Sequence, residues 1–282
     1  MQVKDEHFAN AHWRMAGCSI VGHSHLDRGE ECDDNFAWAQ VADWMVAVVS
    51  DGAGSAPHGD RGSSLASRLV SNQIAYDLAR THARSPDEPE IAEIVTLALS
   101  DTREVIEAFA NLHDDALRDY GHTIVGAVMR GRRALFFHIG DGAAIAMQRH
   151  GKDRWALAAH SMPRNGEFAN ATYFLTENGW RQQLQLASVE DFDTILMMTD
   201  GLTPFALDRG QAEPDPNFVI GVVDDLNDLD SGAAQKSIRR LLMRDKIAMG
   251  DGDDKTLLWA SNSGDARAAA GLSDPRYGDA ER

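Results

Sequence analysis

Cysteine and long apolar runs are scarce in this sequence. Its 282 residues include two cysteines, Cys18 and Cys32, which are too few for a disulfide framework and do not form a C-x-x-C pair. The first residues contain no basic segment followed by an apolar run, and no stretch approaches the roughly 18 apolar residues of a membrane helix. We therefore predict a cytoplasmic protein that does not have a membrane as a partner.

The sequence also has few basic residues. It contains 27 Lys and Arg residues and 44 Asp and Glu residues, which gives a formal net charge of −17. Such a chain is repelled by nucleic acid and by anionic lipid, so neither is an expected partner. The sequence also lacks the G-x-x-x-x-G-K-[ST] phosphate loop, the G-x-S-x-G nucleophile elbow and the H-E-x-x-H zinc motif. These absences disfavour a P-loop nucleotidase, a serine hydrolase with that elbow and a zinc enzyme.

The chain is nevertheless long and apolar enough to fold around a sizeable core, since 43% of its residues are hydrophobic. We predict a single domain over residues 1–260. Residues 161–190 have weak periodicity and are predicted to form a flap or a small insertion. The polar residues 261–282 are predicted to be a mobile tail.

Hydrophobic periodicity gives a coarse secondary structure. Strands are predicted at Ala16–Val21, Asn35–Gln40, Trp44–Ser50, His122–Met129, Ala134–Ile139, Ala143–Arg149, Thr194–Thr199 and Lys255–Ala260. Helices are predicted at Ser63–Arg80, Pro89–Leu112 and Gln235–Met243. Strands in adjacent runs and helices in separate blocks indicate an α+β domain with largely antiparallel sheets.

An aspartate follows an apolar strand again and again in this chain. The instances are VAVVS-Asp51-Gly52, LFFHI-Gly140-Asp141-Gly142 and ILMMT-Asp200-Gly201. A single Asp-Gly after a strand is usually a turn. Repetition favours another interpretation, because strand ends at one edge of a sandwich bring carboxylates together, and their mutual repulsion is relieved by a divalent cation such as Mg²⁺ or Mn²⁺.

The order of these motifs resembles the metal-dependent type 2C protein phosphatases, over about residues 16–260. The matching segments are Asp33-Asp34, Asp51-Gly52-Ala53-Gly54, Gly62-Ser63-Ser64-Leu65-Ala66-Ser67, Gly121-His122-Thr123, Gly140-Asp141-Gly142, Thr199-Asp200-Gly201 and Asp253-Asp254-Lys255-Thr256. Two further segments resemble a bacterial branch of stand-alone domains, namely Gly22-His23-Ser24-His25 through Asn35, and Phe168-Ala169-Asn170-Ala171-Thr172. The resemblance implies a four-layer α/β/β/α sandwich of two antiparallel sheets.

The resemblance also implies an activity, the hydrolysis of phosphoserine and phosphothreonine on proteins by a metal-activated water. It implies that the catalytic residues are Asp34, Asp51, Asp200 and Asp253. The implied metal ligands for two Mn²⁺ or Mg²⁺ ions and a weaker third are Asp34, Asp51, Gly52, Asp141, Asp200 and Asp253. Asp51 would bridge two ions, Gly52 would contribute its carbonyl, and Asp141 would serve the third ion. A phosphorylated protein is the implied substrate, and a serine/threonine kinase is an expected partner.

Several positions depart from the family pattern. Asp33 stands where Glu is common, and Ala53 replaces a histidine proposed to protonate the leaving group in many members. The nearest substitute is His58, although a lone loop histidine is more often solvent-exposed. His122 and the strand residue His138 are interpreted as packed or hydrogen-bonded rather than catalytic.

The phosphate-binding arginine of the family is also displaced. Counting back five residues from Asp34 gives Gly29, so Arg28 or His25 is predicted to bind phosphate, with a surface arginine as the alternative. Asp254 stands where Asn is common, and it either tightens metal binding or faces solvent.

Two other functions stay open from the sequence. A catalytically weak type 2C scaffold would act as a regulatory binding module, and Ala53 and the shifted arginine motivate this hypothesis. A phosphatase for a small phosphorylated metabolite is the second alternative. Turnover of p-nitrophenyl phosphate with Mn²⁺ discriminates the first, and a comparison of phosphopeptides with metabolites discriminates the second.

Overall fold

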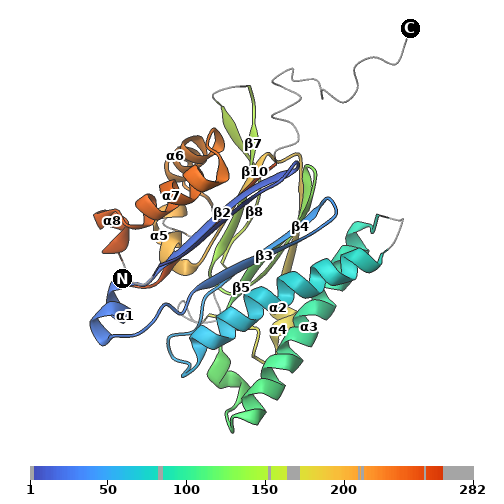
Figure 1. Ribbon diagram of the computed structural model, residues 1–282, viewed down its shortest axis with the longest axis vertical. Helices are drawn as coiled ribbons and strands as arrows, with labels where there is room; N and C mark the ends of the chain where they lie inside the picture. The colour runs from blue at the N-terminus through green and yellow to red at the C-terminus, as the bar shows by residue number, and fades with distance from the viewer. Residues whose placement is uncertain are drawn as a thin grey trace.

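The computed structural model describes residues 3–81, 85–151, 154–163, 172–208, 210, 213–250 and 252–262. Within these residues the chain forms two antiparallel β-sheets that pack face to face, with helices on both outer faces (Figure 1). This arrangement confirms the predicted four-layer α/β/β/α sandwich.

The strand order of each sheet places segments from distant parts of the chain side by side. In the first sheet the order is β1 (Val3–Ala9), β2 (Trp13–Ile20), β11 (Lys255–Asn262), β10 (Thr194–Met198), β7 (Ala143–Arg149) and β8 (Trp155–Ser161). In the second sheet the order is β3 (Asn35–Val41), β4 (Trp44–Ser50), β5 (Ile124–Arg130), β6 (Arg133–Ile139) and β9 (Gln185–Glu190).

Alternating side chains on the strands build the apolar layers, because successive residues of a strand point to opposite faces. In β4, Val46 and Val48 pack against the helices on one side, while Met45 and Val49 pack against the other sheet. Similarly, Leu258 of β11 enters the layer between the sheets and its neighbour Trp259 faces the other helices. Each sheet is therefore buried on both faces, which accounts for strands that read as nearly continuous apolar runs.

Two long helices cover the second sheet, and another pair covers the first (Figure 1). The first pair is α2 (Gly59–Arg80) and α3 (Glu88–Leu112), and the second pair is α6 (Pro216–Asn227) and α7 (Ser231–Leu242). The shorter helices are α1 (His23–Arg28), η1 (Leu117–Tyr120), α4 (Trp180–Gln183), η2 (Asp200–Leu202), α5 (Thr203–Ala206) and α8 (Asp245–Ala248). Among the described residues, the helices fall short of the length and apolarity that a membrane crossing requires.

Some predicted boundaries differ from the structure. The segment predicted as a flap, 161–190, contains α4 and β9, so its last part is the edge strand of the second sheet. Ser261 and Asn262, which were assigned to the tail, belong to β11, and residues 263–282 lie outside the described residues. The branch motif at 168–172 also lies outside them, except for Thr172.

Candidate metal centre

Three of the predicted acids meet at one edge of the sandwich. Asp51 follows β4, Asp141 follows β6 and Asp200 follows β10, so both sheets contribute. Carboxylate oxygens of the three residues lie within 4.8 Å of one another. Residues far apart in the sequence thus form a single anionic cluster, as their positions at the ends of strands predicted.

The backbone around Asp51 is fixed by Thr123, in the Gly121-His122-Thr123 segment. Its hydroxyl accepts a hydrogen bond from the Asp51 amide at 3.1 Å, and its own amide donates to the Asp51 carbonyl at 2.8 Å. Gly140 packs directly on Thr123 with a φ of 120°, and a Cβ at position 140 would lie 2.6 Å from the Thr123 Cβ. Glycine is therefore required immediately before Asp141, both for its backbone conformation and for this close approach.

The Asp34 carboxylate is buried beside the cluster, with 2% of the residue exposed. Two threonine hydroxyls donate to its Oδ2, one from Thr199 at 2.7 Å and one from Thr256 at 2.8 Å. Its Oδ1 is also buried and has no hydrogen-bond partner among the described residues. One oxygen is therefore held in place by its neighbours while the other stays available to a ligand.

Burial dominates the electrostatics of these carboxyl groups. Burial, followed by the charges of Asp200, Asp34, Asp141 and Asp253, raises the pKa of Asp51 well above its ordinary value. Burial, followed by the charge of Asp254, raises the pKa of Asp34 in the same way. The pKa of Asp141 is raised chiefly by burial too, against a hydrogen bond from Thr172. The predicted acids are therefore close enough to destabilise one another's ionised forms.

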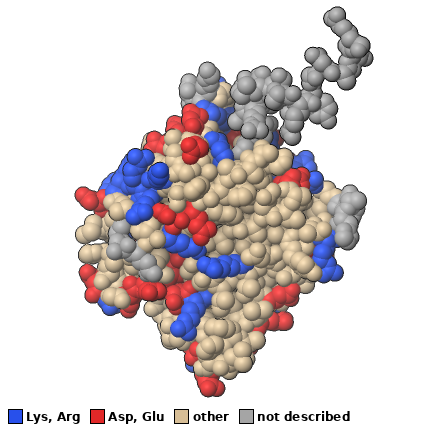
Figure 2. All heavy atoms as spheres, in the orientation of Figure 1, with Lys and Arg blue, Asp and Glu red and all other residues tan. Residues whose placement is uncertain are grey.

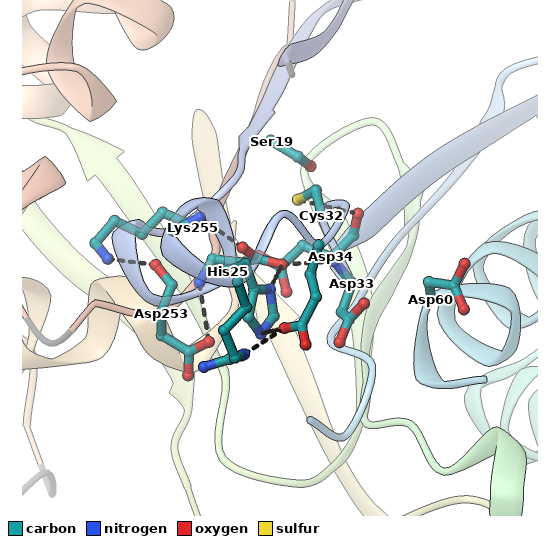
Figure 3. Close-up of polar contacts among 12 residues, drawn as sticks. Ser19, His25, Cys32, Asp33, Asp34, Asp60, Asp253 and Lys255 are labelled. Carbon is teal, nitrogen blue, oxygen red and sulfur yellow. Dashed lines mark hydrogen bonds and ion pairs between the residues drawn. The ribbon is translucent and has the colours of Figure 1, made fainter. Parts of the chain in front are cut away.

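A buried lysine brings positive charge to the same edge. Lys255, which is 1% exposed, donates from Nζ to the backbone carbonyl of Asp253 at 2.6 Å (Figure 3). A single ammonium cannot balance the charges of Asp34, Asp51, Asp141, Asp200 and Asp253 together. The centre therefore has a surplus of negative charge if its carboxyl groups are ionised.

The donor set fits a hard divalent cation. Oδ1 of Asp34 and Oδ1 of Asp141 are both buried without a hydrogen-bond partner among the described residues, which is a costly state for a carboxylate. Carboxylate and carbonyl oxygens are the ligands that Mg²⁺ and Mn²⁺ prefer. Among the described residues, neither histidine nor cysteine belongs to the group formed by Asp51, Asp141 and Asp200, so a soft-metal site is not indicated.

The two residues predicted to bind phosphate are both engaged elsewhere. Arg28, at the end of α1, has a half-exposed side chain and donates from Nε to Glu30 at 2.6 Å. His25 is buried, and its Nδ1 lies 3.1 Å from Oδ2 of Asp254. Asp254 is itself 2% exposed, so the alternative that it faces solvent is wrong.

His122 and His138 are buried as the sequence indicated, whereas His58 is less exposed than was expected for a lone loop histidine. His122 is fully buried with Nδ1 2.8 Å from the Tyr120 carbonyl, and burial lowers its pKa to about 4, so it is neutral at physiological pH. His138 is fully buried with Nδ1 2.9 Å from the Ser161 hydroxyl. His58 is half-buried, and its Nε2 lies 3.3 Å from a carboxylate oxygen of Asp115.

Sequence reasoning missed the residues that orient the acids. Thr123, Thr199 and Thr256 all lie inside motifs that the sequence analysis quoted, and Thr172 lies at the end of the branch motif. Their shared signal was a hydroxyl residue at a fixed place beside a motif aspartate. The sequence could not say which aspartate each hydroxyl would reach, since Thr199 and Thr256 both donate to Asp34, more than 160 residues away.

Known proteins resemble this chain over most of its length. A family model described as protein phosphatase 2C matches residues 21–243. Serine/threonine-protein phosphatase 3 of Escherichia coli (strain K12) is 27% identical over 264 residues, which cover 88% of this chain and 99% of that protein.

Solved structures share the fold at lower identity. A serine-threonine phosphatase 2C from Toxoplasma gondii is 12% identical, with a TM-score of 0.62 and coverage of 92% of this chain and 99% of that one. RsbX, in a crystal structure with magnesium, is 16% identical, with a TM-score of 0.54 and coverage of 92% of this chain and 100% of that one. With a family match over most of its length and a convergent set of partly buried acids, this chain belongs to the protein phosphatase 2C family, the metal-dependent phosphatases of protein serine and threonine residues.

Proposed function

We propose that the acidic cluster around Asp51 is the active site of this phosphatase, and that it hydrolyses phosphoserine and phosphothreonine on proteins with Mn²⁺ or Mg²⁺. The observation that carries the proposal is the meeting of the partly buried Asp51, Asp141 and Asp200, whose carboxylate oxygens lie within 4.8 Å of one another. We assign metal binding to the same set as the sequence did: Asp34, Asp51, Gly52 through its carbonyl, Asp141, Asp200 and Asp253.

The protein's own part in the chemistry is to hold oxygen ligands rigidly. Thr199 and Thr256 fix one oxygen of Asp34, and Thr123 fixes the backbone of Asp51, so little ordering is left to occur when ligands bind. Bound divalent cations would supply a water nucleophile at neutral pH and stabilise negative charge on the phosphoryl group. In this scheme the acids hold the cations, and the reaction does not need a cysteine or serine nucleophile.

Arg28 is our candidate for the substrate phosphate, as the sequence predicted. Its half-exposed side chain now pairs with the half-exposed Glu30 at 2.6 Å, a pair of modest strength in water. A phosphate dianion competes well for a guanidinium, because two parallel charge-assisted hydrogen bonds are available to it. Exchange of Glu30 for substrate phosphate on Arg28 is therefore part of the proposal.

The biological setting follows from the same assignment. A phosphorylated protein is the proposed substrate, a serine/threonine kinase is the proposed functional counterpart, and the cytoplasm is the proposed location. The magnesium-bound crystal structure of RsbX supports Mg²⁺ as one candidate ion. The regulatory binding module and the metabolite phosphatase are not favoured, because the match extends over the whole of a relative named as a protein phosphatase.

The test compares Asp51→Asn with Asp101→Asn, which makes the same chemical change on an exposed position of α3. With Mn²⁺ and a phosphoserine peptide, Asp51→Asn is expected to lose activity by about 1,000-fold or more, because the loss of a carboxylate that would hold the metal removes at least ~4 kcal/mol of transition-state stabilisation. Asp101→Asn is expected to keep the activity of the unmodified protein.

The same assay separates the alternatives. Phosphopeptides are expected to be hydrolysed with a higher kcat/KM than a panel of phosphorylated metabolites, and the order would be reversed for a metabolite phosphatase. Activity that survives in Asp51→Asn, or a protein that takes up Mn²⁺ without turning over any phosphate ester, would contradict the proposed function.

A further inference from the structure

Three residues from two segments of the chain direct N–H groups at the Asp254 carboxylate. Its Oδ1 accepts from the Gly22 amide at 2.6 Å. Its Oδ2 accepts from the Asp33 amide at 2.5 Å and lies 3.1 Å from Nδ1 of His25. Because an ionised carboxylate only accepts, Nδ1 of His25 must carry the hydrogen in this contact. Both oxygens of Asp254 are thus occupied by protein donors.

These bonds connect Asp254 to the segments that carry the predicted metal ligands. Asp33 immediately precedes Asp34, and its carbonyl accepts a hydrogen bond from the Gly52 amide at 3.2 Å. On its other side, the Asp254 amide donates to Oδ1 of Asp253 at 2.9 Å. A continuous path of hydrogen bonds therefore runs from the Asp253 carboxylate through Asp254 and Asp33 to the backbone beside Asp51.

The backbone packs tightly where Gly22 meets this loop. A Cβ on Gly22 would lie 2.2 Å from the carbonyl carbon of Asp253, so any side chain there would displace backbone. The Ser24 amide also donates to the Gly252 carbonyl at 2.9 Å. Figure 3 shows His25, Asp33, Asp34 and Asp253 gathered in this region, with Asp60 set apart on α2. The start of α1 is therefore fastened to the loop before β11 through both backbone and side-chain contacts.

The family's usual asparagine could not make the same set of contacts. A side-chain amide has one acceptor oxygen and one NH₂ group, whereas three N–H donors converge on Asp254. Whichever way an asparagine side chain turned at this position, its NH₂ group would face at least one of the N–H groups from Gly22, Asp33 or His25. In this chain the second carboxylate oxygen of Asp254 accepts the hydrogen bond from His25. Without that oxygen a buried N–H group would lack an acceptor, which costs free energy of folding.

We propose that Asp254, together with His25, is a positioning residue that holds the Asp34, Asp51 and Asp253 segments in the geometry for metal binding. His25, Asp33 and Asp254 also bring ligand atoms within 4.8 Å of one another. Because both oxygens of Asp254 already accept hydrogen bonds from protein N–H groups, we assign Asp254 a positioning role and not that of a ligand. This inference rests on the proposed function, since it presumes that the neighbouring acids bind a cation. It also gives His25 a structural task in place of the phosphate contact predicted from sequence.

The experiment measures the dissociation constant for Mn²⁺ by isothermal titration calorimetry on the purified full-length chain. Asp254→Asn is expected to weaken Mn²⁺ binding by about 10–100-fold, the usual effect of removing a residue that orients metal ligands. The control is Asp60→Asn, which removes the same charge nearby. The backbone carbonyl of Asp60 makes the hydrogen bonds to Asn35 and Ser63, and the substitution leaves it unchanged. This control is expected to stay within about 2-fold of the unmodified chain.

A second pair of variants tests His25 and covers the case in which Asp254→Asn does not fold, as judged by circular dichroism. His25→Leu removes the donor and is expected to weaken Mn²⁺ binding several-fold. His25→Asn keeps an N–H donor at the place of Nδ1 and is expected to restore most of the affinity. Equal affinities in both His25 variants and the unmodified chain would overturn the proposal.

Other outcomes separate this inference from the proposed function. Asp254→Asn with unchanged affinity, or Asp60→Asn with an equal loss, would overturn the positioning role while leaving the metal centre intact. An unmodified chain that binds no Mn²⁺ would instead overturn the proposed function itself.

Discussion

The carboxyl group of Asp33 is expected to make the free energy of unfolding depend on pH. Burial, opposed in part by His25, raises the pKa of Asp33 from 3.8 to about 6. The folded metal-free chain therefore binds more protons at Asp33 than the unfolded chain between about pH 4 and pH 6. Ionised Asp33 thus lowers the free energy of unfolding, and this cost is fully present above pH 6 and lost as the pH falls toward 4.

Asp33→Asn isolates this effect, because its backbone amide and carbonyl, which make the contacts to Asp254 and Gly52, are unchanged by the substitution. In EDTA at pH 7.5 the variant is expected to melt at a higher temperature than the unmodified chain. The difference is expected to shrink at pH 5, where Asp33 is mostly protonated in the folded state. Differential scanning calorimetry at both pH values checks this, and a difference that grows on acidification would contradict the assigned direction. Comparing two chains at each pH cancels the opposite contribution of buried His122.

Two helical glycines differ in how close their neighbours lie, so replacement by alanine is expected to affect stability differently at each. Gly62 lies within α2 and Gly221 lies within α6. Inside a helix, glycine ordinarily lowers the free energy of unfolding by about 0.5–1 kcal/mol relative to alanine. A Cβ at Gly62 would lie 2.3 Å from the Tyr120 carbonyl oxygen, whereas a Cβ at Gly221 would have no neighbour within 4 Å. The first glycine is needed for packing and the second is not.

Two alanine variants are therefore expected to have opposite effects. Gly221→Ala should raise the free energy of unfolding by about 0.5–1 kcal/mol. Gly62→Ala should lower it by about 1–3 kcal/mol, because the Tyr120 backbone has to move. Urea denaturation measures both variants, and a stabilised Gly62→Ala would show that α2 can shift away from Tyr120 without cost.

Elements in the centre of each sheet were predicted better than those at the edges. The central strand β4 matched its predicted range, since Trp44–Ser50 is buried throughout. The edge strand β3 was predicted at Asn35–Gln40, whereas the edge strands β1, β8 and β9 were not predicted. These three strands are only partly buried and carry polar or small residues such as Lys4 and Ala187. A strand at the edge of a sheet buries fewer side chains, so its sequence has a weaker apolar pattern. Its extended conformation depends more on hydrogen bonds to the neighbouring strand.

The whole molecule carries a large negative charge, and part of it is concentrated in the centre. On the face in Figure 2, Lys and Arg are interspersed with Asp and Glu instead of gathering into a broad basic surface, in line with the net charge of −17. The folded chain brings Asp34, Asp51, Asp141, Asp200 and Asp253 together against their mutual repulsion. Cation binding is therefore expected to stabilise the whole fold.

At a free Mn²⁺ concentration 100 times the dissociation constant, the expected gain is about 2.7 kcal/mol, or roughly 5–10 °C in melting temperature for a chain of this size. Asp51→Asn is expected to lose this gain while melting at or above the unmodified chain in EDTA, because the substitution relieves repulsion. Scanning calorimetry with Mn²⁺ and with EDTA gives both values. Equal melting temperatures of the unmodified chain in the two conditions would argue against a cation in the centre.

The amino-acid sequence alone predicted an α+β domain with largely antiparallel sheets, and the resemblance of its motifs to a known family implied the four layers and the acids of the metal centre. Short apolar runs predicted most of the strands. The repeated aspartates after these strands, in the order of a known family, predicted which carboxylates would lie in the metal centre. These features are local, since each depends on a few neighbouring residues and on the periodicity of the backbone.

How the acids are held became visible only in the folded molecule. Thr199 and Thr256 reach Asp34, and Asp254 ties Gly22, Asp33 and His25 together, across separations of more than 160 residues. A hydrogen bond depends on positions within a few tenths of an ångström, and strand order and register set those positions. The sequence therefore left open whether Asp254 tightens metal binding or faces solvent, and the fold shows it buried and hydrogen-bonded to Gly22 and Asp33.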